Sequence, residues 1–164
     1  MEKRETRMST IHVEATQVIN ARPEEIYAVL SDYRVAHPAI LPKPYFTDLV
    51  VEKGGQGAGT VTRVLMKVWG TEFKYHQIVS EPEPGRVLVE TDLETGQFTK
   101  FIFEPLNGGT QTRLTIASEF PASQGFKGFM EKLMQPPVAR GIYMKEMANI
   151  AQYVQTRRTA VSAG

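Results

Sequence analysis

The stretch FIFEPLNGGTQTRLTI, residues 101–116, contains two segments of alternating apolar and polar residues on either side of Asn-Gly-Gly at 107–109. Such alternation is typical of a β-strand with one buried face. Asn-Gly and Gly-Gly pairs favour tight hairpin turns because these residues tolerate positive φ. The stretch therefore predicts an antiparallel hairpin with strands over 97–106 and 110–120.

The same arrangement repeats toward the N-terminus. Short turn sequences rich in Gly and Pro, such as GGQGAG at 54–59 and EPEPG at 81–85, separate further segments that resemble strands. Consecutive strands joined by short turns must pair antiparallel. These additional strands are predicted over 11–20, 45–53, 60–69, 71–81 and 86–94.

Helical patterns lie before and after this β-rich region. Residues 22–32 predict a helix, with Pro23 at its first position and acidic residues in its first turn. Apolar residues at helical spacing predict a second, long helix over 123–157, with a break or kink at Pro136-Pro137.

A proline-rich corner, VAHPAILPKPYF at 35–46, joins the first helix to the second strand. We expect Pro38 to end the first helical region, since the residue before a proline disfavours the α conformation. The later prolines stiffen the chain. The corner is also apolar, unlike an ordinary linker.

The order of elements predicts an α+β fold: a seven-stranded antiparallel sheet whose apolar face is covered by the long C-terminal helix. We see no linker, internal repeat or low-complexity tract within the 164 residues. The sequence thus predicts a single domain over 11–157, with flexible tails at 1–10 and 158–164.

Composition narrows the functional classes. The chain has no cysteine, which excludes disulfides and thiolate chemistry. A net charge of +1 argues against nucleic acid as a partner. No apolar run is long enough to cross a membrane and no secretory leader is recognisable, so we expect a cytoplasmic protein without integral membrane association. No metal-binding motif is present, and we expect neither a metal nor a cofactor.

Four stretches, taken in order, resemble the START-like (SRPBCC) superfamily, and the resemblance extends over about residues 11–156. The stretches read INARPEEIYAVLSDYRVAHPAILP (19–42), GGQGAGTVTRV (54–64), VSEPEPGRVLVET (79–91) and FIFEPLNGGTQTRLTI (101–116). This superfamily includes polyketide cyclase/dehydratase-like, lipid-transport-like, Bet v 1-type and START proteins. The resemblance implies a helix-grip fold: a curved sheet wraps the long helix, and two short helices lie between the first two strands. It also implies an internal cavity for a small, mostly apolar ligand. In such a fold the corner at 35–46 faces the long helix across the cavity mouth, so we interpret the corner as a wall or gate of the cavity.

The residues expected to contact this ligand lie in the corner, on the inward phases of three strands and on the long helix. Met side chains suit irregular apolar ligands, and Arg140 could anchor a ligand carboxylate. The same side chains could instead simply fill a core, and a one-residue shift would exchange the faces of a strand. The candidates are His37, Ile40, Leu41, Tyr45, Val64, Met66, Tyr75, Gln77, Phe101, Phe103, Phe129, Met130, Leu133, Arg140 and Tyr143.

Groups able to carry protons are sparse. Among the histidines, His12 and His76 fall on the outward phase of their strands, whereas His37 lies in the corner. A proton carrier, if the protein is an enzyme, would be His37 or one of Tyr75, Tyr143 and Glu119.

Three functional hypotheses follow. The first is a carrier or sensor that binds a lipid, polyketide, quinone or isoprenoid-like molecule. The second is an enzyme of the polyketide cyclase/dehydratase type that uses the same cavity, in which positioning contributes more than strong acids or bases. The third is a protein-interaction module whose cavity has collapsed. The sequence indicates neither the ligand nor the oligomeric state.

Overall fold

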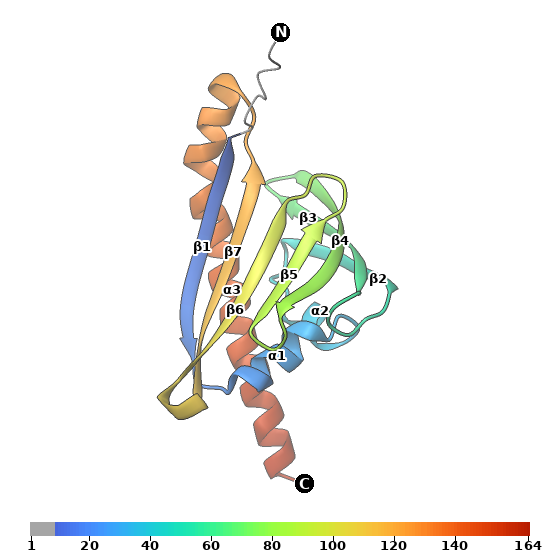
Figure 1. Ribbon diagram of the computed structural model, residues 1–164, viewed down its shortest axis with the longest axis vertical. Helices are drawn as coiled ribbons and strands as arrows, with labels where there is room; N and C mark the ends of the chain where they lie inside the picture. Colours follow the sequence, from blue (N-terminus) through green and yellow to red (C-terminus); the bar gives the residue numbers. More distant parts are fainter. Residues whose placement is uncertain (1–8) are drawn as a thin grey trace.

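Seven strands and a long helix dominate the computed structural model, which describes residues 9–164 apart from the side chain of Phe126 (Figure 1). A single 3₁₀ turn, Asn107–Gly109, lies between β6 and β7. The elements in chain order are β1 (Thr10–Ile19), α1 (Pro23–Ser31), α2 (Ala36–Ile40), β2 (Phe46–Lys53), β3 (Val61–Val68), β4 (Thr71–Glu83), β5 (Val87–Asp92), β6 (Phe98–Leu106), β7 (Gln111–Pro121) and α3 (Gly125–Ser162).

All seven strands belong to one antiparallel sheet in the order β1-β7-β6-β5-β4-β3-β2. Each strand from β2 to β7 therefore pairs with its neighbour in sequence, and β1 crosses over to pair with β7. The hairpin predicted from 101–116 is present, with Phe103 opposite Leu114. Its turn contains three consecutive residues with positive φ, Asn107, Gly108 and Gly109, which explains the Asn-Gly-Gly sequence.

The sheet curves around α3, which packs most closely along β1 (Figure 1). The inward face of the sheet and one face of α3 form the main core, which includes Val13, Leu114 and Ile116 from the sheet and Met147 and Ile150 from the helix. The helices α1 and α2 close one end of the sheet (Figure 1). This is the predicted helix-grip fold, including the two short helices between the first two strands.

The long helix differs from its prediction at two places. It is continuous through Pro136 and Pro137, where we expected a break or kink. The two prolines remove two backbone donors, but the helix is held on both sides of them. On the N-terminal side, Glu131 accepts hydrogen bonds from the backbone N and Oγ of Ser123, each at 2.8 Å. On the C-terminal side, the buried Met147 packs in the core.

The helix also continues to Ser162, beyond the end predicted at 157. The reason lies in Arg158, whose Nε donates to Glu25 Oε1 at 2.9 Å and whose Nη1 donates to the carbonyl oxygen of Asn20 at 3.0 Å. Most of the predicted C-terminal tail, 158–164, is therefore helical. Of the predicted N-terminal tail, residues 1–8 lie outside the described residues, and β1 already includes Thr10.

Pro38 does not end a helix as expected. It lies in the first turn of α2, where an amide N–H would have no partner within the helix. The two short helices are separated at Asp32, whose carboxylate accepts hydrogen bonds from the backbone N–H groups of Arg34, Val35 and Ala36.

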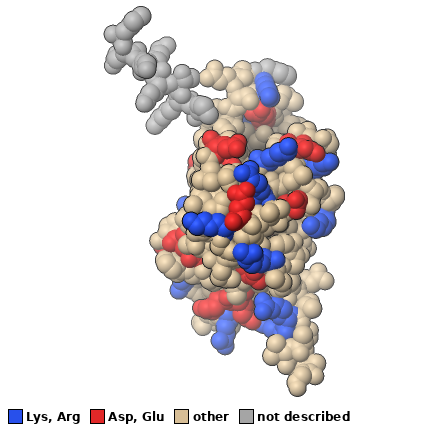
Figure 2. All heavy atoms as spheres, turned by 90° about the vertical axis from the view of Figure 1, so that its right-hand side faces the viewer, with Lys and Arg blue, Asp and Glu red and all other residues tan. Residues whose placement is uncertain are grey.

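Charged residues are mixed on the face that Figure 2 displays, where Lys and Arg side chains lie among Asp and Glu side chains. Ion pairs on the sheet include Arg113–Glu104 at 2.9 Å and Lys67–Glu72 at 3.2 Å. Exposed pairs of this kind contribute little to stability.

Candidate functional site

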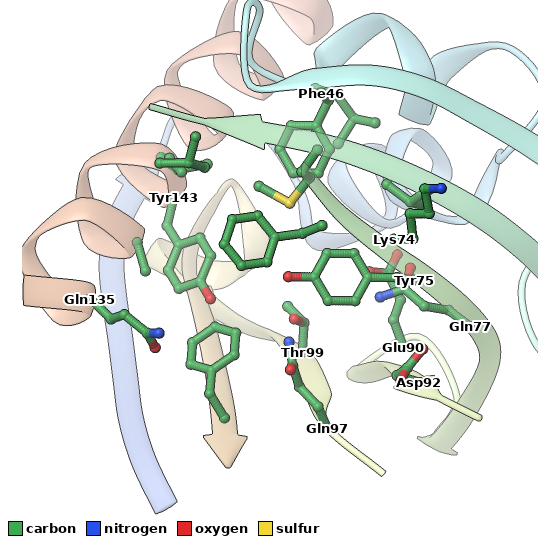
Figure 3. Close-up of a pocket in the computed structure, with 18 of the residues that line it drawn as sticks. Phe46, Lys74, Tyr75, Gln77, Glu90, Asp92, Gln97, Thr99, Gln135 and Tyr143 are labelled. Atoms are coloured by element: carbon green, nitrogen blue, oxygen red, sulfur yellow. The ribbon is translucent and has the colours of Figure 1, made fainter. Parts of the chain in front are cut away.

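A cavity of about 600 Å³ lies between the sheet and α3. This volume falls within the range of about 300–1,000 Å³ that is typical of small-molecule sites. Tyr75 from β4 and Tyr143 from α3 reach into the space from opposite sides, and Phe46 lies across another side (Figure 3).

The structure brings together about half of the candidates named from the sequence. Strand alternation correctly predicted which faces of β3, β4 and β6 turn inward. The candidates that line the cavity are His37, Leu41, Val64, Met66, Tyr75, Gln77, Phe101 and Tyr143.

The corner is divided between cavity and core. Leu41 lines the cavity, but Ile40 is fully buried in the core and does not reach it. Tyr45 points toward α3, where the Lys145 ammonium lies 4.9 Å from the centre of its ring. Phe103 also fills the core, where its ring and that of Tyr27 lie at 74° to each other with centroids 6.0 Å apart. The idea of a gate made by the whole corner is therefore replaced by a wall to which Leu41 and His37 contribute.

Three apolar candidates near the start of α3 do not line the cavity, whereas Met134, Val138 and Ala139 of the same helix do. Phe129 and Leu133 are 61% and 59% exposed, and Met130 is 37% exposed. Arg140, the expected anchor for a carboxylate, instead points toward β1, where its Nε donates to the carbonyl oxygen of Glu14 at 3.2 Å. These residues share a helix with the lining residues but occupy other faces of it.

A polar cluster, of which only His37 was among the candidates from the sequence, forms part of the cavity wall. Glu90 of β5 is 8% exposed and accepts a hydrogen bond from the Tyr33 hydroxyl at 2.8 Å. The Nε2 atom of His37 lies 3.7 Å from the same carboxylate oxygen. The His37 ring stacks on Tyr33 at 4.6 Å, and its Nδ1 lies 2.6 Å from the Leu30 carbonyl oxygen. Nδ1 therefore carries a proton and donates it to this oxygen, which leaves Nε2 directed at Glu90.

Glu146 of α3 is the second carboxyl group in the wall. It is 4% exposed, and within residues 9–164 its Oε1 atom has no hydrogen-bond partner. Burial, assisted by the charge of Glu90, raises the pKa of Glu146 to about 8. The side chain is thus mostly protonated at neutral pH and can donate a proton inside the cavity.

Both carboxyl groups had a signal in the sequence. Glu146 lies between Tyr143 and Ile150 at helical spacing, so it interrupts the buried stripe of α3. Glu90 shares its strand phase with the buried Leu88. A carboxylate at an inward position is costly unless it has a function or a partner, and this criterion would have identified both residues.

Hydroxyl groups complete the wall. The Tyr143 hydroxyl donates to Ser118 Oγ at 2.5 Å, and Ser118 Oγ lies 2.8 Å from Thr99 Oγ1. Burial raises the pKa values of Tyr75 and Tyr143, so both phenols remain protonated. Asp92 differs from Glu146: burial alone would raise the pKa of Asp92, but hydrogen bonds from Thr95 and the backbone of His76 lower it.

The remaining titratable candidates lie elsewhere. Glu119 is on β7 outside the cavity, with one carboxylate oxygen 3.9 Å from the exposed His12. His76 pairs with Glu52 at 2.8 Å on the outer surface. No group of three or more His, Asp or Glu side chains within the described chain is arranged to hold a metal. None of the helices described is long and apolar enough to cross a membrane.

Comparison with known families matches residues 10–155 to the family described as polyketide cyclase / dehydrase and lipid transport. The chain belongs to this family. The match spans every strand and most of α3, in agreement with the observed helix-grip fold. No curated protein matches the sequence.

Members of the START-like superfamily are also found among similar solved structures. The KanY protein is 26% identical, with a TM-score of 0.77 over 90% of this chain and 99% of that one. The ZhuI aromatase/cyclase from Streptomyces sp. R1128 is 18% identical, with a TM-score of 0.73 over 91% and 96% of the two chains. A START superfamily protein from Mycobacterium smegmatis is 15% identical, with a TM-score of 0.60 over 92% and 98%. The latter two establish a shared fold.

Proposed function

We propose that the protein is an acid–base enzyme that eliminates water from a β-hydroxy carbonyl compound bound in the cavity. The observation that carries this proposal is Glu146, a buried and mostly protonated carboxyl group with an unpartnered oxygen beside Glu90. A buried carboxyl group without a hydrogen-bond partner destabilises the fold. Groups in a cavity whose pKa values are shifted are candidates for catalysis.

The two sides of the polar wall suit the two proton transfers of an elimination. The Glu146 carboxyl group donates its proton to the leaving hydroxyl, so the C–O bond breaks and water departs. The His37–Glu90 pair removes the proton from the carbon next to the carbonyl, and those electrons form the C=C bond. A proton then returns from this pair to Glu146, and the net change is the loss of one water molecule.

The apolar part of the cavity would hold the body of the substrate. Phe46, Phe101 and Phe120 contribute aromatic surface to the lining. Their burial against a ligand stabilises the complex by roughly 25 cal/mol per Å². Enclosure also strengthens the electrostatic effect of the carboxyl groups, because less water surrounds them.

The test uses 4-hydroxy-4-phenylbutan-2-one, whose dehydration gives the conjugated ketone 4-phenylbut-3-en-2-one, followed by its ultraviolet absorbance. We expect the wild type to exceed the buffer rate at least 100-fold and Glu146→Gln to lose about 100-fold of that activity. Glu83→Gln, an exposed carboxyl group on β4, is the matched control and should retain activity. A wild-type rate equal to that in buffer would overturn the proposal of a dehydrating enzyme.

Binding without turnover is the second candidate, and the predominantly hydrophobic lining favours it. The side chains of Val64, Met66 and Leu41 shape the cavity but have no group that could transfer a proton. A carrier would bind an apolar dye or the ketone product but would not accelerate the dehydration. The third hypothesis required a collapsed interior, and the open cavity does not support it.

A further inference from the structure

The cavity wall contains an excess of acidic groups. The lining residues that the structure describes include Glu72, Glu90, Asp92, Glu94 and Glu146, whereas Lys74 is their only Lys or Arg. Lys74 is exposed, and Glu72 is paired with the exposed Lys67. No Lys or Arg of the described lining is therefore buried where it could neutralise an anionic ligand.

Arg140 would have changed this balance had it turned inward. Its guanidinium group instead binds the β1 backbone at Glu14. The inner wall is thus formed by Glu90 and Glu146, which are 8% and 4% exposed. Glu90 already accepts a hydrogen bond from Tyr33. Besides Glu72, Lys74 and Glu94, the other titratable side chains of the described lining are Asp92, Tyr75, Tyr143 and His37.

The Oε1 atom of Glu146, which has no hydrogen-bond partner among the described residues, determines which ligand groups can bind at the part of the cavity that Glu146 lines. A hydroxyl group can donate to Oε1, and a carbonyl oxygen can accept from the carboxyl group when Glu146 is protonated. A carboxylate ligand would place a second negative charge beside Glu90 in a site with little water, where repulsion is strong.

We propose that Glu90 and Glu146 together act as a charge filter: the cavity accepts uncharged ligands whose buried end is a hydroxyl or carbonyl group and rejects carboxylates of the same shape, including fatty acids. This selectivity concerns the cavity of the proposed function and rests on that cavity being a ligand site. It restricts the ligand class to neutral alcohols, phenols and ketones.

The test is displacement of the neutral dye N-phenyl-1-naphthylamine at pH 7 by two molecules of similar size, 4-phenylbutan-2-one and 4-phenylbutyrate. We expect the ketone to compete at least tenfold better than the carboxylate. In the double variant Glu90→Gln/Glu146→Gln the difference should fall below about threefold, while Glu83→Gln retains it. Dye binding by the double variant confirms that its cavity is intact, and Glu90→Gln alone, which removes the charged member of the pair and should also reduce the difference, replaces it if the double variant does not fold.

Two results would overturn the charge filter. One is equal competition by ketone and carboxylate in the wild type, and the other is a preference that persists unchanged in both Gln variants. Tighter competition by 4-phenylbutylamine than by the ketone would equally overturn the assignment of an uncharged ligand. Failure of the dehydration assay with retained discrimination would remove only the proposed reaction, whereas dehydration without discrimination would remove only the filter.

Discussion

The Nε2 atom of His37 lies 3.7 Å from Oε1 of Glu90, while its Nδ1 is fixed 2.6 Å from the carbonyl oxygen of Leu30. The backbone of α1 therefore orients the imidazole so that its second nitrogen faces a buried carboxylate. This arrangement, one nitrogen fixed and the other directed at an acidic group, is what a proton-transferring histidine requires.

Replacing His37 by Asn distinguishes the roles of the two imidazole nitrogens. The Asn amide can still donate to Leu30, but nothing remains in the place of Nε2. We expect dehydration of 4-hydroxy-4-phenylbutan-2-one to fall about 100-fold, with the affinity for N-phenyl-1-naphthylamine unchanged within about twofold. Equal losses of turnover and dye binding would indicate that His37 only shapes the wall.

Glu146 should make the fold less stable as the pH rises. Its pKa is about 8 in the folded protein and close to 4.5 when unfolded. Between these values the unfolded chain releases a proton that the folded protein retains, so the free energy of unfolding decreases from about pH 4.5 to about pH 8 and then levels off. Glu146→Gln should flatten this slope and, near pH 8, stabilise the protein by a few kcal/mol.

Urea denaturation at pH 5, 7 and 8.5 measures this effect. The neighbouring groups Tyr33, His37, Glu90 and Tyr143 are present in both proteins, so the difference between wild type and Glu146→Gln isolates Glu146. A Gln variant that is less stable than the wild type at pH 8.5 would contradict the buried, raised-pKa assignment.

Ile40 and Leu41 provide a matched pair in the corner between α1 and β2. Ile40 is fully buried away from the cavity, so Ile40→Ala should cost about 2–5 kcal/mol of stability and leave dye affinity nearly unchanged. Leu41 lines the cavity, so Leu41→Ala should change dye affinity at least threefold. Thermal unfolding and dye titration on the same samples give both values, and identical behaviour of the two variants would contradict the division of the corner.

Trp69, at the tip of the β3–β4 hairpin, has a backbone conformation that is unfavourable for a residue of its type. Its φ is +49° and its side chain is 77% exposed, while the following Gly70 has a φ of +80°. Two consecutive residues with positive φ favour Asn-Gly rather than Trp-Gly. We expect Trp69→Asn to stabilise the protein by about 0.5–1 kcal/mol and Gly70→Ala to destabilise it; calorimetric melting temperatures would show both.

The end of α3 depends on Arg158. Its contacts with Glu25 and Asn20 extend the helix past residue 157. Hydrogen bonding to Arg158 lowers the pKa of Glu25, but both side chains are about one-third exposed, so Arg158→Ala should cost less than about 1 kcal/mol globally. Amide hydrogen exchange should nevertheless accelerate over residues 158–162, and unchanged exchange there would contradict the proposed role.

Most of the fold could be predicted because local residues encode it. Asn-Gly-Gly at 107–109 and the glycines between strands determine where the chain reverses, and alternation determines which side chains turn inward. The site was harder to predict, because Glu90, Glu146 and His37 come from three separate elements. Their proximity depends on how α3 rotates about its axis against the sheet, which also explains why Arg140 and Phe129 were placed in the lining incorrectly.

The pairing of β1 with β7 has a consequence for biosynthesis. Val13 lies opposite Ser118, so the first strand finds its partner only after more than a hundred further residues have been made. Until then β1 has no neighbour in the sheet, and contacts between such distant segments form slowly. The cavity also lacks one wall until α3 has left the ribosome. A ligand of the proposed site could therefore bind only after α3 has been made and has packed against the sheet.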